Sequence, residues 1–339
     1  MKAIVVREFG PPSVLRLEDV PTPEPGPGEV LIRVHAVSVN RTLDLVVRAG
    51  NYARPVALPL VLGVDPSGVI VKVGPDVTER NVGDRVVTAI RVSKDSAPGG
   101  GPRLLGVHVW GGYAEFVKLP AERTALIPHN VDFATTTVVA RHAPTAFHLL
   151  RDRARLAAGE WVLVMGAAGG LGSAGVQAAK YLGAKVIAAA GADERVQVGL
   201  DLGADAGVNY RKQDLTAEVL RITAGAGVGV VFENIGDPEL FAKAFAGLGR
   251  GGRLVTAGGH GGGIVPLDVN RLYLNQITVI GATGDMPADV AVSLQAAAEG
   301  RFKAVIDRVL PLSQAALAHE LVAQRAATGK IVLDPTRLR

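Results

Sequence analysis

The stretch WVLVMGAAGGLG, residues 161–172, constrains the fold of this chain more than any other. Its apolar beginning is typical of a buried strand, and the glycines that follow lead into residues 173–182, which have the apolar spacing of a helix. We therefore predict a strand, a tight turn and a helix start. At such a turn Gly169 lets the backbone approach a ligand, Gly172 lets the helix pack against the strand, and unpaired helix N–H groups can hold a pyrophosphate.

Glycine-rich turns of this kind also occur as plain packing devices, and here Ala167 stands at the first position of the GxGxxG pattern. A second strand-like run at residues 185–190 follows at the spacing of a βαβ unit, which favours a dinucleotide site over a structural turn. The expected cofactor contacts along the turn are Ala167, Ala168, Gly169, Gly170, Leu171 and Gly172.

The end of the second run bears on the type of cofactor. Sites that prefer NAD place an acid there to accept a hydrogen bond from the ribose 2′-OH, but this chain has Ala190 and Gly191. Without that acid a 2′-phosphate is not repelled, and three nearby side chains could bind it: Arg195, Tyr210 and Arg211. NADP(H) is therefore the predicted cofactor. In the alternative, Arg195 is a solvated helix residue, and Asp193 or Glu194 takes the ribose.

Composition sets outer limits on the protein's class. A chain of 339 residues with 48% hydrophobic and 20% charged residues is ordinary for a globular enzyme of two domains. The chain has no cysteine, which rules out disulfides, thiolate zinc ligands and a cysteine nucleophile, and fits a cytoplasmic protein. The net charge of +4 and the pI near 9.4 come from basic residues spread along the chain, which does not favour nucleic-acid binding. No signal peptide or membrane span is expected.

Secondary-structure patterns divide the chain into a β-rich part and an α/β part. Before residue 130 short β-branched runs at 3–6, 29–37, 68–73, 85–90 and 114–118 are separated by turn sequences. A helical stretch over residues 133–156 leads into six strands alternating with helices, which predicts a doubly wound parallel sheet whose last strand is 278–281. A helix (288–299), a strand (305–310), a helix (314–325) and a strand (330–333) follow.

Several signatures together resemble the medium-chain dehydrogenase/reductase superfamily, and specifically its zinc-independent, quinone oxidoreductase-like branch. They are SVNRTLDLVVRAGNY (38–52), LPLVLGVDPSGVI (58–70), VGDRV (82–86), GGYAEFVKLP (111–120), PTAF (144–147), GAAGGLGSAGVQAAK (166–180), LGADAGVNYR (202–211), GRLVTAG (252–258) and GKIVL (329–333). The resemblance covers nearly the whole chain. It implies a GroES-like catalytic domain built from residues 1–130 and 285–339, a Rossmann domain over residues 131–284, and a cleft between them where the nicotinamide meets the substrate.

The residues at the zinc positions of related enzymes decide the predicted chemistry. Zinc-using relatives have a cysteine in the first signature, GHE in the second and a cysteine before the threonine of PTAF, whereas this chain has NRTLD, Gly63-Val64-Asp65 and Arg141-His142. These residues do not make the three-ligand set of a catalytic zinc site. His142 and His148 could lie on one helix, but we interpret them as satisfied histidines because no third ligand stands at metal spacing. The glycine-rich insert 96–106 carries no cysteine lobe. No metal is predicted.

The same resemblance assigns the substrate side of the site. It implies that Asn40 lies beside the nicotinamide and that Tyr52 lines the substrate pocket; the alternatives are a turn-capping amide for Asn40 and rim packing for Tyr52. Asp65 is expected to anchor structure by accepting backbone N–H groups of its own GVDPSG turn. NRTLD has one residue more between Asn and Asp than the quinone reductase pattern. Further expected cofactor contacts are Thr145, Gly191, Arg195, Tyr210, Asn234, Gly258 and Lys330.

Three functions follow from these residues. The first is an NADPH-dependent quinone or enone reductase that transfers hydride without zinc, and enoyl-CoA is a substrate variant of it. The second is a zinc-free alcohol dehydrogenase or ketone reductase, and the third is a non-catalytic NADPH-binding protein of the same fold. The first is favoured, because reducing a ketone requires protonation of an alkoxide, and no Tyr/Lys pair or zinc site for this is recognisable. A homodimer is also expected, since the superfamily pairs the edge strand 278–281 into a twelve-stranded sheet.

Overall fold

The computed structural model describes residues 1–96, 101–259, 261–282, 287–324 and 326–337. The chain forms two compact units, one made of residues 1–140 and 304–339 and the other of residues 141–303. The division that we expected lay at residues 130/131 and 284/285, and the second of these positions is outside the described residues. Helix α8 (Pro287–Ala298), which we grouped with the returning segment, belongs to the second unit.

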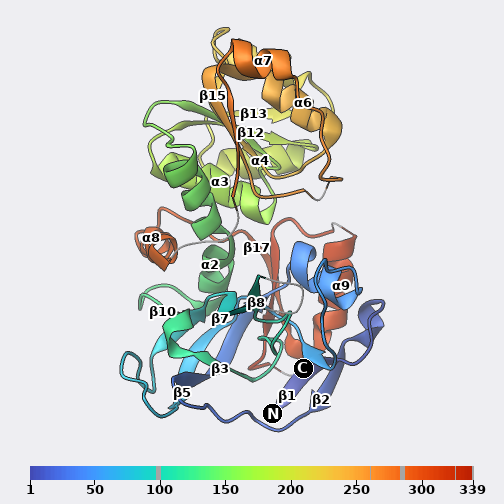
Figure 1. Ribbon diagram of the computed structural model, residues 1–339, viewed down its shortest axis with the longest axis vertical. Helices are drawn as coiled ribbons and strands as arrows, with labels where there is room; N and C mark the ends of the chain where they lie inside the picture. Colours follow the sequence, from blue (N-terminus) through green and yellow to red (C-terminus); the bar gives the residue numbers. More distant parts are fainter. Residues whose placement is uncertain (97–100, 260, 283–286, 325, 338–339) are drawn as a thin grey trace. The chain divides into compact units, whose positions relative to one another are not determined.

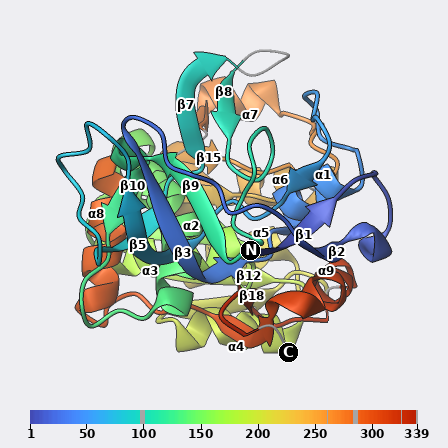
Figure 2. The same cartoon turned by 90° about the horizontal axis from the view of Figure 1, so that it is seen from below.

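The first unit is built around a mixed sheet in the strand order β10-β6-β5-β3-β18-β17, with β9 also paired to β3 (Figures 1 and 2). Strand β18 comes from the end of the chain and pairs antiparallel with β3, so that both ends of the sequence share one sheet. The sheet consists of β3 (Glu29–Ser38), β5 (Ser67–Val73), β6 (Arg85–Thr88), β9 (Phe116–Pro120), β10 (Thr124–Leu126), β17 (Ile306–Pro311) and β18 (Lys330–Asp334).

Smaller elements complete this unit. Strand β1 lies between β2 and β4 in a three-stranded sheet, and β7 pairs with β8. Of these five strands only β1 was predicted, whereas helix α9 lies within the helix predicted over residues 314–325. Their bounds are β1 (Lys2–Val6), β2 (Arg16–Asp19), β4 (Leu60–Val61), β7 (Arg91–Ser96), β8 (Pro102–Leu104), α1 (Val46–Arg48), α9 (Ala315–Ala323), a π-helix at Arg41–Leu45, and 3₁₀ turns at Pro12–Val14, Ala121–Arg123 and Leu312–Gln314.

The second unit confirms the predicted doubly wound sheet. Its strands are all parallel and follow the order β13-β12-β11-β14-β15-β16, so that the strand–turn–helix segment begins at a central strand. The strands are β11 (Trp161–Met165), β12 (Lys185–Ala190), β13 (Ala206–Asn209), β14 (Val228–Glu233), β15 (Leu248–Thr256) and β16 (Thr278–Gly281). The helices are α3 (Gly170–Tyr181), α4 (Asp193–Asp201), α5 (Leu215–Ile222), α6 (Pro238–Ala246), α7 (Val269–Leu274) and α8.

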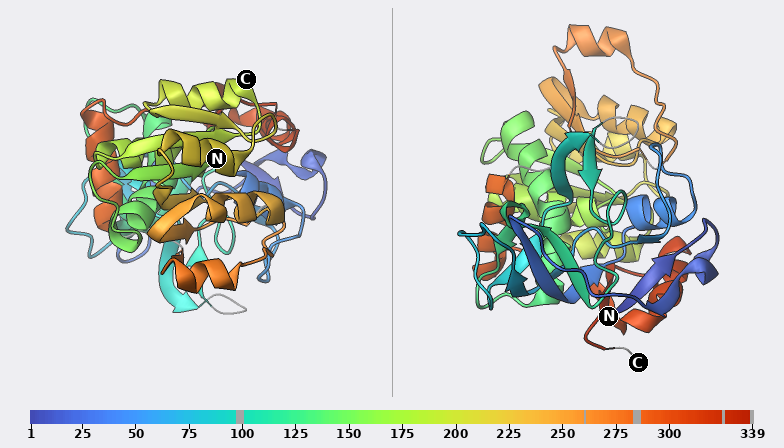
Figure 3. Two further views of the ribbon diagram at one scale, coloured as in Figure 1. Left: turned by 90° about the horizontal axis from the view of Figure 1, so that it is seen from above. Right: turned by 60° about the horizontal axis from the view of Figure 1, so that its bottom comes forward.

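Alternating side chains of the strands bury against helices on both faces of this sheet. Ile187 and Ala189 of β12 belong to a core cluster that includes Val219 of α5 and Phe245 of α6. Ala188, which lies between them in sequence, faces the other way and contacts α4, where a Cβ on Gly199 would lie 2.5 Å from the Ala188 Cβ. This burial of side chains on both faces of the sheet explains why the strands are almost entirely apolar. Figure 3 shows the same elements in two further views.

Helix α2 (Phe133–Phe147) continues into a π-helix at His148–Arg153, so the predicted helical stretch ends three residues earlier than expected. No helix among the described residues is long and apolar enough to cross a membrane.

Candidate active site

The turn between β11 and α3 has the close contacts that require glycine. A Cβ on Gly172 would lie 2.1 Å from the Gly166 carbonyl oxygen, so the helix packs directly on the turn. Helix α3 begins at Gly170, earlier than residue 173 where we predicted it, and its capping residue Gly169 supplies no side-chain hydrogen bond. The first N–H groups of the helix are therefore open to an anion. This backbone cradle fits the pyrophosphate of a dinucleotide.

The other residues predicted along this turn differ in their exposure. Ala167 is buried, and its N–H donates to the Ala189 carbonyl of the neighbouring strand at 3.1 Å. Ala168 and Leu171 are partly exposed, and Gly169 is exposed. The turn lies where the sequence pattern predicted it, although Gly170 to Gly172 form the first helical residues rather than a loop. That these residues contact a cofactor stays a prediction.

The end of strand β12 meets the residue that follows β13. A Cβ on Gly191 would lie 3.0 Å from Cε2 and 3.1 Å from the hydroxyl oxygen of Tyr210, so the phenol ring lies against the glycine. Arg195 is partly buried on the first turn of α4. Asp193, the alternative ribose ligand, already accepts a 2.6 Å hydrogen bond from Asn209 Nδ2 and pairs with Lys212. Lys212 is a third cation near this strand end, besides Arg195 and Arg211, and was not among the predicted site residues.

Strands β14 and β15 add the next predicted contacts. Asn234 donates from Nδ2 to the Met165 carbonyl oxygen at 2.6 Å, and its own carbonyl oxygen would lie 2.2 Å from a Cβ on Gly258. The structure therefore brings Asn234 and Gly258 together beside the glycine turn. Thr145 is partly exposed on α2. The buried carboxyl of Glu233 accepts the Ile235 and Gly236 N–H groups, and burial raises its pKa above the ordinary value.

In the first unit, Asn40 is the centre of a buried polar network. Its Nδ2 donates to Asp65 Oδ2 at 3.0 Å and to the Ser38 carbonyl and hydroxyl oxygens at 3.2 Å. Its Oδ1 accepts from Lys330 Nζ at 2.6 Å, and only 2% of the residue is exposed. The ammonium of Lys330 also donates to the Val39 carbonyl oxygen at 3.0 Å. The amide thus joins a buried cation to a buried carboxylate, and both of its hydrogens are used.

This network corrects two interpretations. Asn40 precedes the π-helix but makes no side-chain capping bond, so the turn-capping alternative is wrong. Asp65 is an anchor as expected, but its donors are the N–H and hydroxyl of Ser38, at 2.8 and 2.5 Å, and Asn40 rather than its own turn. The side chain of Lys330 donates into this network, and 9% of the residue is exposed. Its predicted contact with a cofactor stays a prediction.

The extra residue of NRTLD is absorbed by the π-helix at Arg41–Leu45. The Leu45 N–H reaches back five residues to the Asn40 carbonyl oxygen at 3.3 Å, which is the wider hydrogen-bonding step of a π-helix. Because the turn widens, Asp44 still faces inward. Its carboxylate accepts the Asn40 N–H at 2.7 Å and the Gly63 N–H at 3.1 Å. Single π turns inside helices are frequent at functional sites.

Tyr52 also has partners. Arg54 Nη2 donates to its hydroxyl oxygen at 3.1 Å, and the His108 ring meets the phenol edge-on with centroids 6.0 Å apart. The phenol is partly exposed. Tyr52 is therefore held in place from two sides. Whether it lines a substrate pocket stays a prediction.

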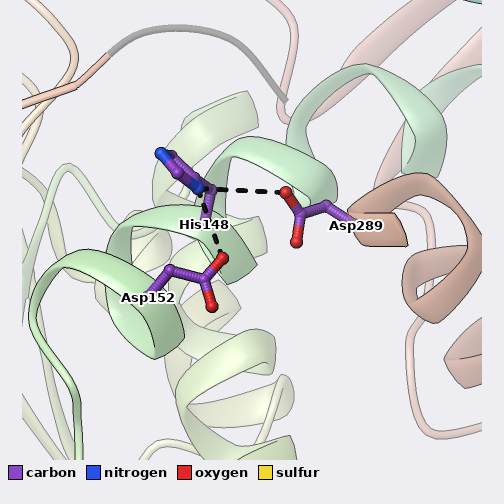
Figure 4. A group of neighbouring side chains, drawn as sticks. All are labelled: His148, Asp152 and Asp289. Atoms are coloured by element: carbon purple, nitrogen blue, oxygen red, sulfur yellow. Dashed lines mark hydrogen bonds and ion pairs between the residues drawn. The ribbon is translucent and has the colours of Figure 1, made fainter. Parts of the chain in front are cut away.

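His148, Asp152 and Asp289 lie close enough together to be candidate ligands of one metal ion (Figure 4). His148 Nδ1 lies 3.3 Å from Asp152 Oδ2 and 4.0 Å from Asp289 Oδ2, whereas His142 is not part of the group. Arg151 already pairs with both carboxylates, at 2.7 and 2.5 Å. Because a bound cation would have to compete with this guanidinium, we interpret the group as an ion-pair network. Part of the insert 96–106 lies outside the described residues.

The pH dependence of stability should report the buried acid Asp44. Burial, followed by the nearby Asp65 charge, raises its pKa from 3.8 to about 6. The folded state therefore keeps a proton that the unfolded state has released, so this contribution to stability falls as pH rises from about 4 to 6. At about 1.4 kcal/mol per pKa unit, the loss is about 3 kcal/mol. We predict that Asp44→Asn removes this loss, as urea unfolding between pH 4 and 7 would show.

The matched control is Asp193→Asn. The pKa of Asp193 is lowered, first by the hydrogen bond to Lys212, so above about pH 4 this carboxyl is ionised in both the folded and the unfolded state. This variant should therefore differ in stability from the wild type by a constant amount between about pH 4 and 7. Parallel pH profiles for Asp44→Asn and the wild type would contradict the assignment of Asp44.

Comparisons with known proteins agree with this architecture. Residues 26–129 match the family described as alcohol dehydrogenase GroES-like domain, and residues 170–299 match the one described as zinc-binding dehydrogenase. A human quinone oxidoreductase is 34% identical over 98% of this chain and 97% of its own. An NAD-dependent alcohol dehydrogenase of Sulfolobus acidocaldarius is 32% identical over 99% of this chain and all of its own.

A solved structure supports the same relationship. The quinone oxidoreductase of Pseudomonas syringae pv. Tomato superposes with a TM-score of 0.83 at 28% identity, covering 98% of this chain and 99% of its own. With its GroES-like unit, its Rossmann-like unit and these full-length relatives, the chain belongs to the medium-chain dehydrogenase/reductase superfamily of NAD(P)H-dependent oxidoreductases.

Proposed function

We propose that the protein is an NADPH-dependent reductase that transfers hydride to a quinone or an α,β-unsaturated carbonyl without zinc. The observation that carries this proposal is the type and the hydrogen bonding of the residues that stand where zinc-using relatives have their metal ligands. The NRTLD stretch stands where zinc-using relatives have a thiolate, and its Asn40 has both amide hydrogens used. Val64 offers no ligand atom, and Asp65 is already bonded by Ser38 and Asn40. These residues satisfy one another rather than converge on an open coordination position.

The proposed roles of the chain's residues follow from the contacts described. The bound dinucleotide supplies the hydride. The open N–H groups at the start of α3 hold its pyrophosphate, and Asn234 and Gly258 shape the edge of the sheet beside it. Arg195 and Tyr210 bind the 2′-phosphate. Asn40 is proposed as the residue that contacts the nicotinamide, and Tyr52 as the residue that contacts the acceptor. One hydride and one solvent proton complete each two-electron reduction.

The alcohol dehydrogenase relative supports a second candidate, a zinc-free ketone reductase or alcohol dehydrogenase. A panel of quinones, enones, enoyl-CoAs, ketones and alcohols assayed with NADPH, NADH or their oxidised forms distinguishes the candidates. Turnover of quinones or enones with no turnover of simple ketones is the expected result. Turnover of ketones or alcohols alone would favour the second candidate, and tight NADPH binding without turnover of any acceptor would favour a non-catalytic binding protein.

The metal content of the purified protein tests the zinc-free mechanism. We predict less than stoichiometric zinc by elemental analysis and no change of activity after chelation, because the chain has no thiolate and offers Val64 at a ligand position. About one zinc per chain, together with activity that chelation abolishes and zinc restores, would sink this prediction.

Cofactor choice tests the role of Arg195. A guanidinium paired with a 2′-phosphate contributes about 1.5 to 3 kcal/mol, or roughly 10-fold to 150-fold in affinity, which a ribose hydroxyl cannot match. Arg195→Ala should therefore weaken NADPH far more than NADH in a fluorescence titration, and Tyr210→Phe should do so more mildly. Ala190→Asp should shift the preference toward NADH. Equal weakening of both nucleotides by Arg195→Ala would mean that the site has been misread.

The edge strand β16 supports a proposed homodimer. Strand β16 ends the six-stranded sheet, and its Val279 is 40% exposed. Nearby α7 exposes Val269, Tyr273 and Leu274 at about 60% each. Apolar edges of this kind pair with another chain unless they are covered. We predict a dimer in sedimentation at micromolar concentration. Val279→Lys should shift it toward monomer, and a monomeric wild type would contradict the proposal.

A further inference from the structure

His142 of α2 lies against the first residue of the pyrophosphate-binding helix. A Cβ built on Gly170 would lie 2.5 Å from His142 Nε2, 2.7 Å from Cδ2 and 3.2 Å from Cε1. The imidazole is therefore in direct contact with Gly170, and a larger residue at position 170 would displace it. Both residues belong to the second unit, so their contact lies within one compact body.

The direction of this contact places the imidazole beside the open end of α3. The Cα–Cβ bond of a helical residue is tilted toward the helix N-terminus, so a group at the Cβ position of the first helical residue stands at that end. Gly170 is that first residue, and its capping neighbour Gly169 makes no side-chain hydrogen bond to the free N–H groups. The end of α3 whose N–H groups could hold an oxyanion is therefore the end that the imidazole contacts.

The position of His142 along α2 agrees with this placement. Thr145, which the superfamily resemblance assigns to the cofactor, follows His142 by one helical turn, and residues three apart share a helix face. The cluster of possible metal ligands in the described part of this unit consists of His148, Asp152 and Asp289, and His142 does not belong to it. His142 thus lies against the glycine turn and outside the His148 group.

We propose that His142 is a further cofactor ligand, which donates from its imidazole to a non-bridging oxygen of the dinucleotide's pyrophosphate. This inference rests on the proposed cofactor-binding function but not on which acceptor is reduced. The pyrophosphate is common to NADH and NADPH, so the contact contributes equally to both. In this respect His142 differs from Arg195, which is proposed to contact the 2′-phosphate of NADPH alone.

The test is the dissociation constant of each nucleotide, measured by fluorescence titration for the wild type and four variants. His142→Ala should weaken NADH and NADPH by the same factor, about tenfold, because a hydrogen bond to a charged group is lost. His142→Gln, whose amide nitrogen can take the place of Nε2, should retain more affinity than His142→Asn. His148→Ala, on the continuation of the same helix, is the matched control and should bind both nucleotides as the wild type does.

The outcomes separate this inference from the function on which it rests. Binding of both nucleotides by His142→Ala with wild-type affinity, or weakening of NADPH alone, would overturn the inference and leave the proposed function intact. Tighter binding by His142→Ala would also overturn it, because the imidazole would then occupy the pyrophosphate's place. If the wild type binds neither nucleotide, the proposed cofactor function itself fails. Unchanged melting temperatures of the variants would exclude a loss of folding as the cause.

Discussion

The first unit depends on a buried charge pair that is relayed through an amide. Lys330 and Asp65 are both nearly inaccessible to water, and Asn40 joins them with its carbonyl toward the ammonium and its amino group toward the carboxylate. Removing one member of such a set leaves an uncompensated charge in the protein interior, which costs several kcal/mol. The constraint also spans the chain, because Asn40 and Lys330 are 290 residues apart in sequence. The returning C-terminal strand is thus fixed both by its pairing with β3 and by this charge.

The second unit depends on close approach of backbone rather than on charge. Gly172, Gly258 and Gly191 each lie where a Cβ would overlap or crowd a carbonyl oxygen or a tyrosine ring. Because these positions have no side chain, strand ends, a helix start and the Tyr210 ring can meet at one edge of the sheet. The two units therefore supply different properties. The second unit offers backbone N–H groups and cations suited to a dinucleotide, and the first holds a buried polar network in which donors and acceptors satisfy one another.

Much of the fold could be predicted because its signals are local. The apolar runs at β11, β12 and β14 and the glycines after β11 indicate a parallel sheet without knowledge of any distant contact. Short strands such as β2 and β4 escaped prediction, since they are only four and two residues long and are held by pairing with β1. Strand β9 begins at Phe116 rather than Ala114, because its register is set by β3. The extra residue in NRTLD was visible in sequence, but its accommodation as a π-helix was not.

The sequence by itself determined the class of fold, the place of the glycine turn between β11 and α3 and the lack of thiolate ligands, because each depends on residue types at short spacing. Only the tertiary structure decided which partners the buried polar residues have. Lys330 faces Asn40, Ser38 supplies the donors to Asp65, and His142 lies on Gly170 while His148 joins an ion-pair network. These contacts join residues far apart in the chain, or select between two histidines on one continuous helical stretch. Hydrogen bonding and burial depend on which residues are close in space, and the spacing of residues along the sequence does not give that proximity.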